Sequence, residues 1–192
     1  MELKGLVQSL LKLSPPNIVL VRLREELSYF DLISLLLRRI IGERNQPVVF
    51  VTGSRPANNL VEKLRSHGFD AKTFLARRML IIVDCLSRSV AAPKIEGVLF
   101  VSSPSDLGEL QLYIERAFRR ISPKGSTAWL LMDGLATFLI FNGTSRVLQF
   151  LIFLTGRLRA LGHYGVIFSY TSGLEDEIQN VIRQYVDVVF EV

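Results

Sequence analysis

Seven short apolar runs, rich in valine and isoleucine, recur along the chain and alternate with segments of helical periodicity. Several of them, such as VVFV, LIIV and VLFV, lack the polar alternation of a half-exposed strand. Continuous apolar strands are typical of a parallel sheet that helices cover on both faces. The pattern predicts strands at 17–21, 47–52, 79–84, 97–102, 127–132, 164–168 and 186–190.

The intervening segments carry apolar stripes at helical spacing. Ser103 is a candidate helix cap, with Pro104 at the first helical position and Asp106 at the third. A later helix, at about 145–161, is apolar around much of its circumference, so we expect it to be deeply buried. The stripes are Ile33, Leu36, Leu37, Ile40 and Ile41 in one helix, and Leu107, Leu110, Ile114, Ala117, Phe118 and Ile121 in another.

Strands and helices that alternate over the whole length predict an α/β protein with three layers, α/β/α, around a mostly parallel central sheet. We find no repeat and no linker, so residues 1–192 are expected to form one domain, with an N-terminal helical segment at 1–14. The stretch 87–96 is small, polar and contains Pro93, which predicts a mobile loop.

Composition sets the broad class of the protein. Hydrophobic residues make up 49% of the 192 residues, which predicts a large core, yet the longest near-apolar stretch, 147–156, is too short to cross a bilayer. The N-terminus lacks the features of a signal peptide. Cys85 is the single cysteine and permits no internal disulfide. We therefore expect a cytoplasmic protein with no membrane contact.

The net charge of +5 is spread along the chain rather than concentrated. Arginine pairs occur at Arg38–Arg39, Arg77–Arg78 and Arg119–Arg120, on or near helices. Such pairs are typical of solvated helix faces, although a nucleic-acid-binding stripe stays an alternative. No aromatic residues alternate with them as a platform for single strands requires.

The junction after the first strand is where many α/β proteins hold phosphates. A phosphate-binding loop needs glycines that expose backbone N–H groups, followed by a lysine. This chain has no glycine between Gly5 and Gly42 and no lysine between Lys12 and Lys63. Bulky and acidic side chains fill the junction instead, and the sequence predicts a closed, ligand-free helix start there. A phosphate held in another way by Arg22 or Arg24 stays an alternative. The residues of this degenerate region are Arg22, Arg24, Glu25, Glu26 and Ser28.

Four later segments, in order and over nearly the whole chain, resemble the KaiC-like branch of the RecA-type ATPases, especially its archaeal members. They are VVFVTGSRPANNLVEKLRSHGFDA at 48–71, LIIVDCLSRS at 80–89, SSPSDLGELQLYIERAF at 102–118, and the stretch from AWLLMD to HYGVIF at 128–168. The last of these is similar to the family's Walker B strand, long helix and following strand. The resemblance implies a RecA-like, P-loop-NTPase-like fold.

The resemblance also implies where an active relative would carry its chemistry. The Walker B position is kept as Asp133, which in such a relative would orient magnesium and its water. The second-strand turn, Thr52, Gly53, Ser54 and Arg55, lacks the carboxylates that would prepare an attacking water. Together with the missing phosphate loop, this departure predicts no ATP or magnesium cofactor.

Other chemistry was weighed residue by residue. Asp84 and Asp133 each end an apolar strand, so they can meet in the crevice where α/β sheets bind ligands. They are the candidate catalytic pair, for acid/base work or a metal, although they can equally cap helix N-termini. His67 and His163 each neighbour a glycine in a helix-ending turn, where a cation is favourable. With one cysteine, the sequence predicts no metal site.

Three hypotheses follow. The leading one is a non-catalytic RecA/KaiC-like domain that acts as a regulator or assembly partner through protein–protein contacts and self-association. Core packing is the usual explanation of the apolar cluster Phe138, Leu139, Phe141, Phe150 and Phe153, and part of this cluster is the candidate for a subunit seam. The alternatives are a nucleotide- or metal-dependent enzyme that uses Asp84 and Asp133, and a nucleic-acid-binding protein.

Overall fold

The computed structural model describes residues 3–24, 29–122, 125–170 and 176–192. In this part of the chain, seven strands form one sheet in the order β4-β3-β2-β5-β6-β1-β7. Every neighbouring pair is parallel. The strands are β1 Ile18–Leu23, β2 Val48–Thr52, β3 Leu80–Asp84, β4 Leu99–Phe100, β5 Trp129–Met132, β6 Tyr164–Tyr170 and β7 Val188–Glu191.

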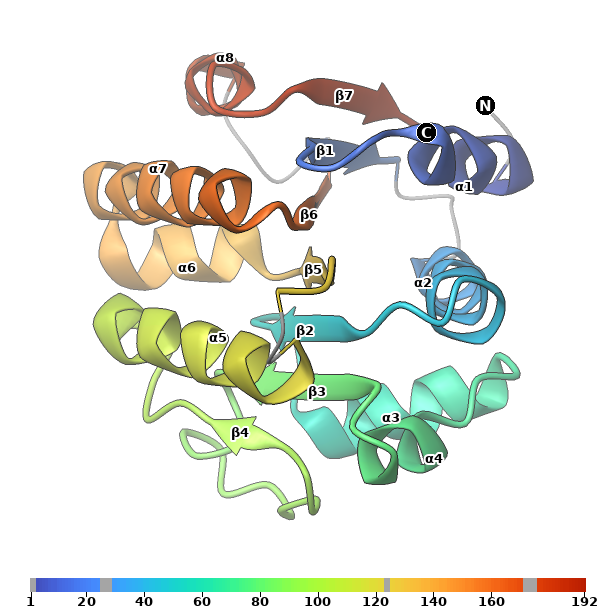
Figure 1. The fold of residues 1–192 in the computed structure, drawn as a ribbon. Coiled ribbons are helices and arrows are strands. Elements are labelled where there is room, and N and C mark those ends of the chain that lie inside the picture. The colour runs from blue at the N-terminus through green and yellow to red at the C-terminus, as the bar shows by residue number, and fades with distance from the viewer. Residues whose placement is uncertain (1–2, 25–28, 123–124, 171–175) are drawn as a thin grey trace.

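Helices cover both faces of the sheet, so the architecture has three layers (Figure 1). One face carries α1 to α4 and the other carries α5, α6 and α7, each over its own apolar core. The helices are α1 Leu3–Lys12, α2 Tyr29–Leu37 with the π-helical turn η1 Arg38–Glu43, α3 Ala57–Ser66, α4 Ala71–Ala76, α5 Leu107–Ile121, α6 Leu135–Asn142, α7 Thr144–Leu161 and α8 Asp176–Arg183.

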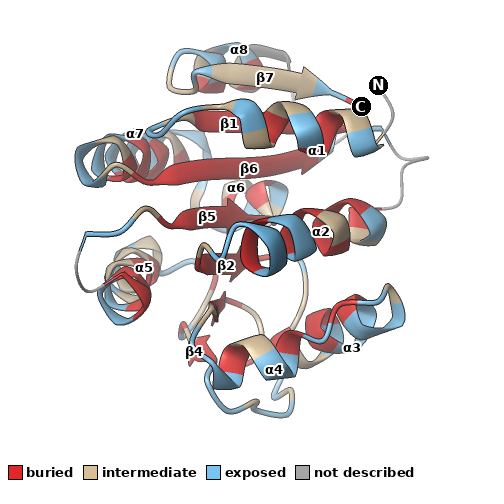
Figure 2. Ribbon diagram, turned by 45° about the vertical axis from the view of Figure 1, so that its right-hand side comes forward, coloured by how far each residue is buried: buried red, intermediate tan, exposed pale blue. Residues whose placement is uncertain are grey.

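The continuous apolar runs form the central strands, as predicted. In β2, β3 and β5 every residue is buried, because helices lie above and below them (Figure 2). All seven predicted strands are present, and β4 is the one that is much shorter than expected. Its position at the edge of the sheet explains the difference, since it pairs with β3 through only two registered positions, Val83↔Leu99 and Asp84↔Phe100.

Two helix predictions need correction. The cap of α5 is Asp106, whose carboxylate accepts from the backbone N–H of Glu109 at 2.8 Å, and not Ser103. Ser103 Oγ instead accepts from Ser105 N in the preceding turn. The later helix, α7, is not deeply buried all round, because Ile152 and Phe153 lie on an exposed face. The prediction from apolar composition therefore overestimated the buried fraction of α7.

The strand order determines which loops meet. β1 and β2 are consecutive strands in the chain, but β6 and β5 lie between them in the sheet. β5, which lies directly beside β2, follows β3 and β4 in the chain. All strands are parallel, so their carboxyl ends lie at one edge of the sheet. The start of α2, the turn after β2 and the turn after β5 therefore converge at that edge.

Candidate functional site

The carboxyl end of β1 leads into the region where a phosphate loop would lie. Arg22 is still in the strand, and its Nη1 donates to Glu191 Oε1 at 2.5 Å. The backbone N–H of Arg24 donates to the carbonyl of Val192 at 2.7 Å. Glu25, Glu26 and Ser28 lie outside the described residues. These bonds connect Arg22 to β7 and Arg24 to Val192, the residue that follows β7.

Asp133, which the sequence resemblance placed at the Walker B position, accepts four hydrogen bonds from the protein. Tyr29, the first residue of α2, donates its hydroxyl to Oδ2 at 2.7 Å. The backbone N–H groups of Gly53 and Ser54 donate to Oδ1 at 2.9 and 3.1 Å, and the Ser54 hydroxyl donates to Oδ2 at 2.9 Å. Asp133 is only 3% exposed. The carboxylate therefore joins the start of α2 to the turn after β2.

Burial dominates the acid–base behaviour of this pair. It raises the pKa of Asp133 above its usual value, while the hydrogen bonds from Tyr29, Ser54 and Gly53 oppose the rise. Burial also raises the pKa of Tyr29 well above its ordinary value, and the negative charge of Asp133 adds to that rise. Tyr29 consequently stays protonated and remains a hydrogen-bond donor at neutral pH.

Two glycines allow the turns after β2 and β5 to touch. Gly134 has a positive φ of 82°, and a Cβ built on it would lie 2.4 Å from the Cα of Gly53. A Cβ on Gly53 would lie 2.7 Å from the Phe138 ring. Backbone atoms and an aromatic ring therefore occupy the space that a side chain at Gly134 or Gly53 would need. Position 134 therefore requires glycine for two reasons, the positive φ and the close approach of the Gly53 backbone.

A small cavity of about 130 Å³ remains beside Asp133. Tyr29, Arg55, Phe168 and Tyr170 contribute to its lining. The Arg55 guanidinium carbon lies 4.6 Å from the centroid of the Phe30 ring. Pockets for cofactors and drug-sized ligands usually have about 300–1,000 Å³. The cavity that the described residues leave here is therefore smaller than this range.

Asp84 is also fully occupied by hydrogen bonds from the protein. Its Oδ2 accepts from the backbone N–H of Ala57, the first residue of α3, at 2.5 Å and from Ser87 Oγ at 2.5 Å. Its Oδ1 accepts from the backbone N–H groups of Leu86 and Ser87 at 2.7 and 2.8 Å. The side chain is 0% exposed. Asp84 thus caps the start of α3 and holds the turn that follows β3.

The two candidate carboxylates lie on strands that flank β2, but different groups hold them. Thr52, the last residue of β2, is in register with Asp84, while Asp133 follows the β5 residue that pairs with Val51. The small cavity is lined by Asp133 and not by Asp84. In the second-strand turn, Thr52 donates its hydroxyl to the Arg55 carbonyl at 2.8 Å, which closes the turn locally.

The remaining candidate residues, Cys85, His163 and His67, have structural surroundings. Cys85 is 0% exposed, and burial raises the pKa of its thiol well above the ordinary value. His163 is buried and stacks on Phe118 at 4.5 Å between ring centroids, and burial lowers its pKa. The expectation that His163 acts as a cation at a helix end is therefore wrong. His67 does lie at the end of α3, where Nδ1 is 2.8 Å from the Lys63 carbonyl.

Neither a metal centre nor a membrane span is seen in the described ranges. Among those residues, no group of three or more His, Cys, Asp or Glu side chains is placed to hold a metal ion. Within the same residues, no helix combines the length and apolar character needed to cross a membrane.

Sequence reasoning missed Tyr29, which is the main addition to the site. Tyr29 and Asp133 are 104 residues apart, and only the strand order brings them together. The sole sequence signal is the aromatic pair Tyr29-Phe30 at the start of a helix. Such a pair is far more commonly a core feature, so it does not by itself indicate a carboxylate partner.

Comparison with known proteins agrees with the fold. A solved structure, the KaiC-like protein PH0186 from the hyperthermophilic archaeon Pyrococcus horikoshii OT3, is similar over 92% of this chain and 72% of its own, with 16% identity and a TM-score of 0.68. At that identity the likeness shows the fold alone, and the predicted KaiC-like, RecA-type α/β/α architecture is confirmed. No curated protein matches the sequence. A family model described as a family of unknown function, DUF7504, matches residues 31–192, and the chain therefore belongs to that family.

Proposed function

We propose that this protein is a non-catalytic domain of RecA/KaiC-like fold that acts as a regulator or assembly partner through protein–protein contacts. The observation that carries the proposal is the set of four protein hydrogen bonds on Asp133. In an active relative that carboxylate would face magnesium and water. Here its acceptor positions are taken by Tyr29, Gly53 and Ser54.

The surroundings of Asp133 support the same conclusion. The junction after β1 has neither the glycines nor the lysine of a phosphate loop. The turn after β2 has no carboxylate, and Gly53 and Gly134 bring backbone into the space between the two turns. We therefore propose that neither ATP nor magnesium is a cofactor. The single cysteine supports a reducing, cytoplasmic setting for this function.

Isothermal titration with ATP and magnesium tests the proposal directly. We expect no saturable heat at millimolar nucleotide, because the groups that would bind phosphate are absent or already bonded. Binding at micromolar concentration would contradict the proposal. The Asp133→Asn variant is the control, since genuine magnesium-dependent binding would weaken in that variant while adventitious binding would not.

We further propose that the protein self-associates through a seam formed by α6 and α7. The α6 segment LATFLIFN contains no charged residue, yet Ile140 is 82% and Phe141 is 53% exposed. Ile152 and Phe153 add exposed apolar area on α7. Exposed apolar side chains that gather on one surface are typical of protein–protein interaction sites. A second copy offers the same uncharged α6 segment.

Replacing Ile140 and Phe141 together by glutamate tests this seam. We expect the dimer dissociation constant to rise at least about tenfold, because association would bury two new charges. Sedimentation velocity over a concentration series measures the change. Leu112→Glu is the matched control, since Leu112 is 65% exposed on α5 and lies outside the seam. Wild-type protein that stays monomeric at high micromolar concentration would contradict self-association.

A further inference from the structure

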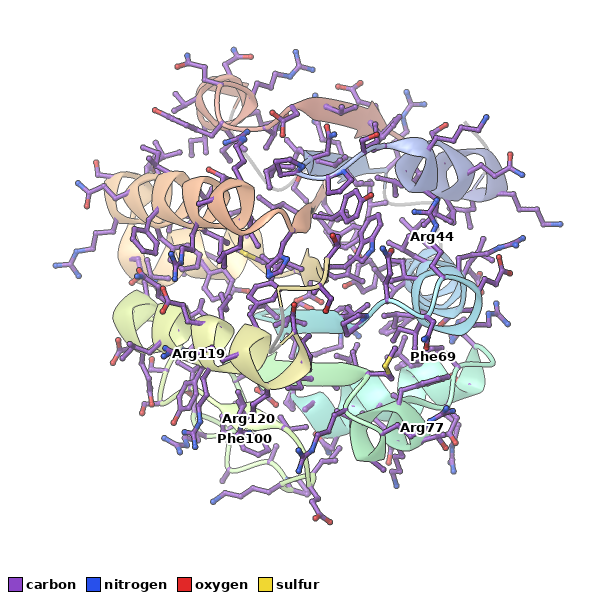
Figure 3. The ribbon with its side chains drawn as sticks, in the orientation of Figure 1. Arg44, Phe69, Arg77, Phe100, Arg119 and Arg120 are labelled. Atoms are coloured by element: carbon purple, nitrogen blue, oxygen red, sulfur yellow. The ribbon has the colours of Figure 1, made fainter. Side chains whose placement is uncertain are left out.

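A groove separate from the small cavity lies at the amino-terminal edge of the sheet, opposite the carboxyl edge that carries Asp84 and Asp133. It has a volume of about 880 Å³ and lies where β3 begins, between α4, the segment before β4 and the end of α5. Arg78 precedes β3, Lys94 belongs to the predicted loop, and Arg120 lies in the last turn of α5. In Figure 3, Arg120 lies between α5 and β4, while Arg77 lies by α4. The groove is thus built from three distant segments.

The charged residues around this groove are mostly cationic. Lys72, Arg78, Lys94 and Arg120 are exposed, and Glu96 is the one carboxylate in the lining. Within the described ranges, the side chains of these four cations form no ion pair or hydrogen bond. In contrast, other basic side chains are already engaged, such as Arg39 with Glu43 at 2.6 Å and Arg119 with Glu115 at 3.5 Å. With four cations against Glu96 in the lining and Asp70 near Lys72, the groove presents an excess of positive charge.

The floor of the groove is apolar and aliphatic. Leu75 and Ile81 are buried among their neighbours but contribute to the lining, and Ile95 is partly exposed beside them. No aromatic side chain contributes to the lining. Bases of single-stranded nucleic acids bind mainly by stacking on aromatic rings. The long stems of the lysines and arginines extend the apolar walls toward the charged rim.

We propose that this groove docks an acidic segment of a protein partner that carries an aliphatic anchor residue. The inference rests on the proposed function in protein–protein contacts and names the surface and the chemistry of the partner. Carboxylates of the segment would pair with the four cations, and the anchor would lie on the aliphatic floor. Complementary charge of this kind speeds association and selects partners. The occupant is inferred from complementarity alone, since acidic side chains match the cationic rim and an aliphatic side chain matches the floor.

Selection from a random peptide library displayed on phage tests the proposal, with the intact protein as bait. We expect enriched peptides to share several acidic residues around a leucine or isoleucine. An enriched peptide, labelled with fluorescein, should bind the Lys94→Glu/Arg120→Glu variant at least about tenfold more weakly by anisotropy. Replacing its aliphatic residue by serine should weaken binding to the wild-type protein as well.

The matched control is Lys63→Glu/Arg65→Glu, which changes net charge equally and lies in the last turn of α3, outside the groove. Thermal melts monitored by circular dichroism check that both double variants fold. Equal losses in the two variants, or enriched peptides without acidic residues, would overturn the proposal. Stronger binding of an oligodeoxythymidine than of the peptide at the same site would assign the groove to nucleic acid instead. ATP binding in the calorimeter would refute the proposed function without affecting this result.

Discussion

Asp133→Ala is expected to lower the free energy of unfolding by about 3–5 kcal/mol, because it leaves buried donors without an acceptor. Gly53 and Ser54 would each keep an unpaired backbone N–H, and Tyr29 would keep a buried hydroxyl. Urea denaturation at neutral pH measures the loss. A magnesium-binding enzyme would give a different result, since removal of a catalytic carboxylate abolishes activity at little cost in stability.

Two variants calibrate this result. Tyr29→Phe removes one of the four donors and is expected to cost about 1.5–3 kcal/mol, the range for a hydrogen bond to a charged group. Asp106→Ala removes an exposed helix cap and is expected to cost about 1 kcal/mol. A loss for Asp133→Ala no larger than that for Asp106→Ala would contradict the role of Asp133 as the link between α2 and the β2 turn.

The raised pKa of Asp133 also sets the sign of its pH dependence. The folded state holds the proton more tightly than the unfolded state, where the pKa is near the ordinary value of 3.8. The corresponding stability is therefore fully present below pH 3.8 and is lost as the pH rises through the folded-state pKa. Denaturation of Asp133→Asn over the same pH range should lack this decrease. A wild-type curve parallel to that of Asp133→Asn would show that Asp133 does not titrate in this way.

Gly134→Ala is the second large effect, with an expected loss of about 2–5 kcal/mol of unfolding free energy. Left-handed backbone costs an alanine about 1–2 kcal/mol, and overpacking adds about 1–3 kcal/mol. The overpacking arises because the new Cβ would lie 2.4 Å from backbone atoms of Gly53, which cannot turn aside as a side chain can. Chemical denaturation measures the combined effect.

Gly162→Ala is the matched control for Gly134→Ala. Gly162 has a similar left-handed conformation, with φ 68°, but nothing lies within 4 Å of its would-be Cβ. Only the backbone term of about 1–2 kcal/mol is therefore expected there. Equal losses in the two variants would mean that the turns after β2 and β5 are not in close contact.

The sequence by itself determined the layers of this protein and the lack of glycine and lysine after the first strand. Continuous runs such as VVFV and LIIV are apolar on both sides, and only a strand covered by helices satisfies that pattern. The lack of glycine after the first strand can also be read directly from the sequence, because the side chains of Arg22 and Arg24 are present whatever the tertiary structure. Strand ends were harder to place, and β4 was predicted longer because edge pairing is not visible in composition.

Tertiary structure decided what the polar residues do. Asp133 was identified from sequence, but its partner Tyr29 lies 104 residues away and meets it only through the strand order. Likewise, His163 sits by a helix end as the sequence suggested, yet the neighbouring Phe118 buries it and favours the neutral ring. The groove of Arg78, Lys94 and Arg120 joins three segments in the same way. Apolar burial is local and periodic, so sequence reveals it, whereas hydrogen bonds and charge clusters depend on which distant segments the fold brings together.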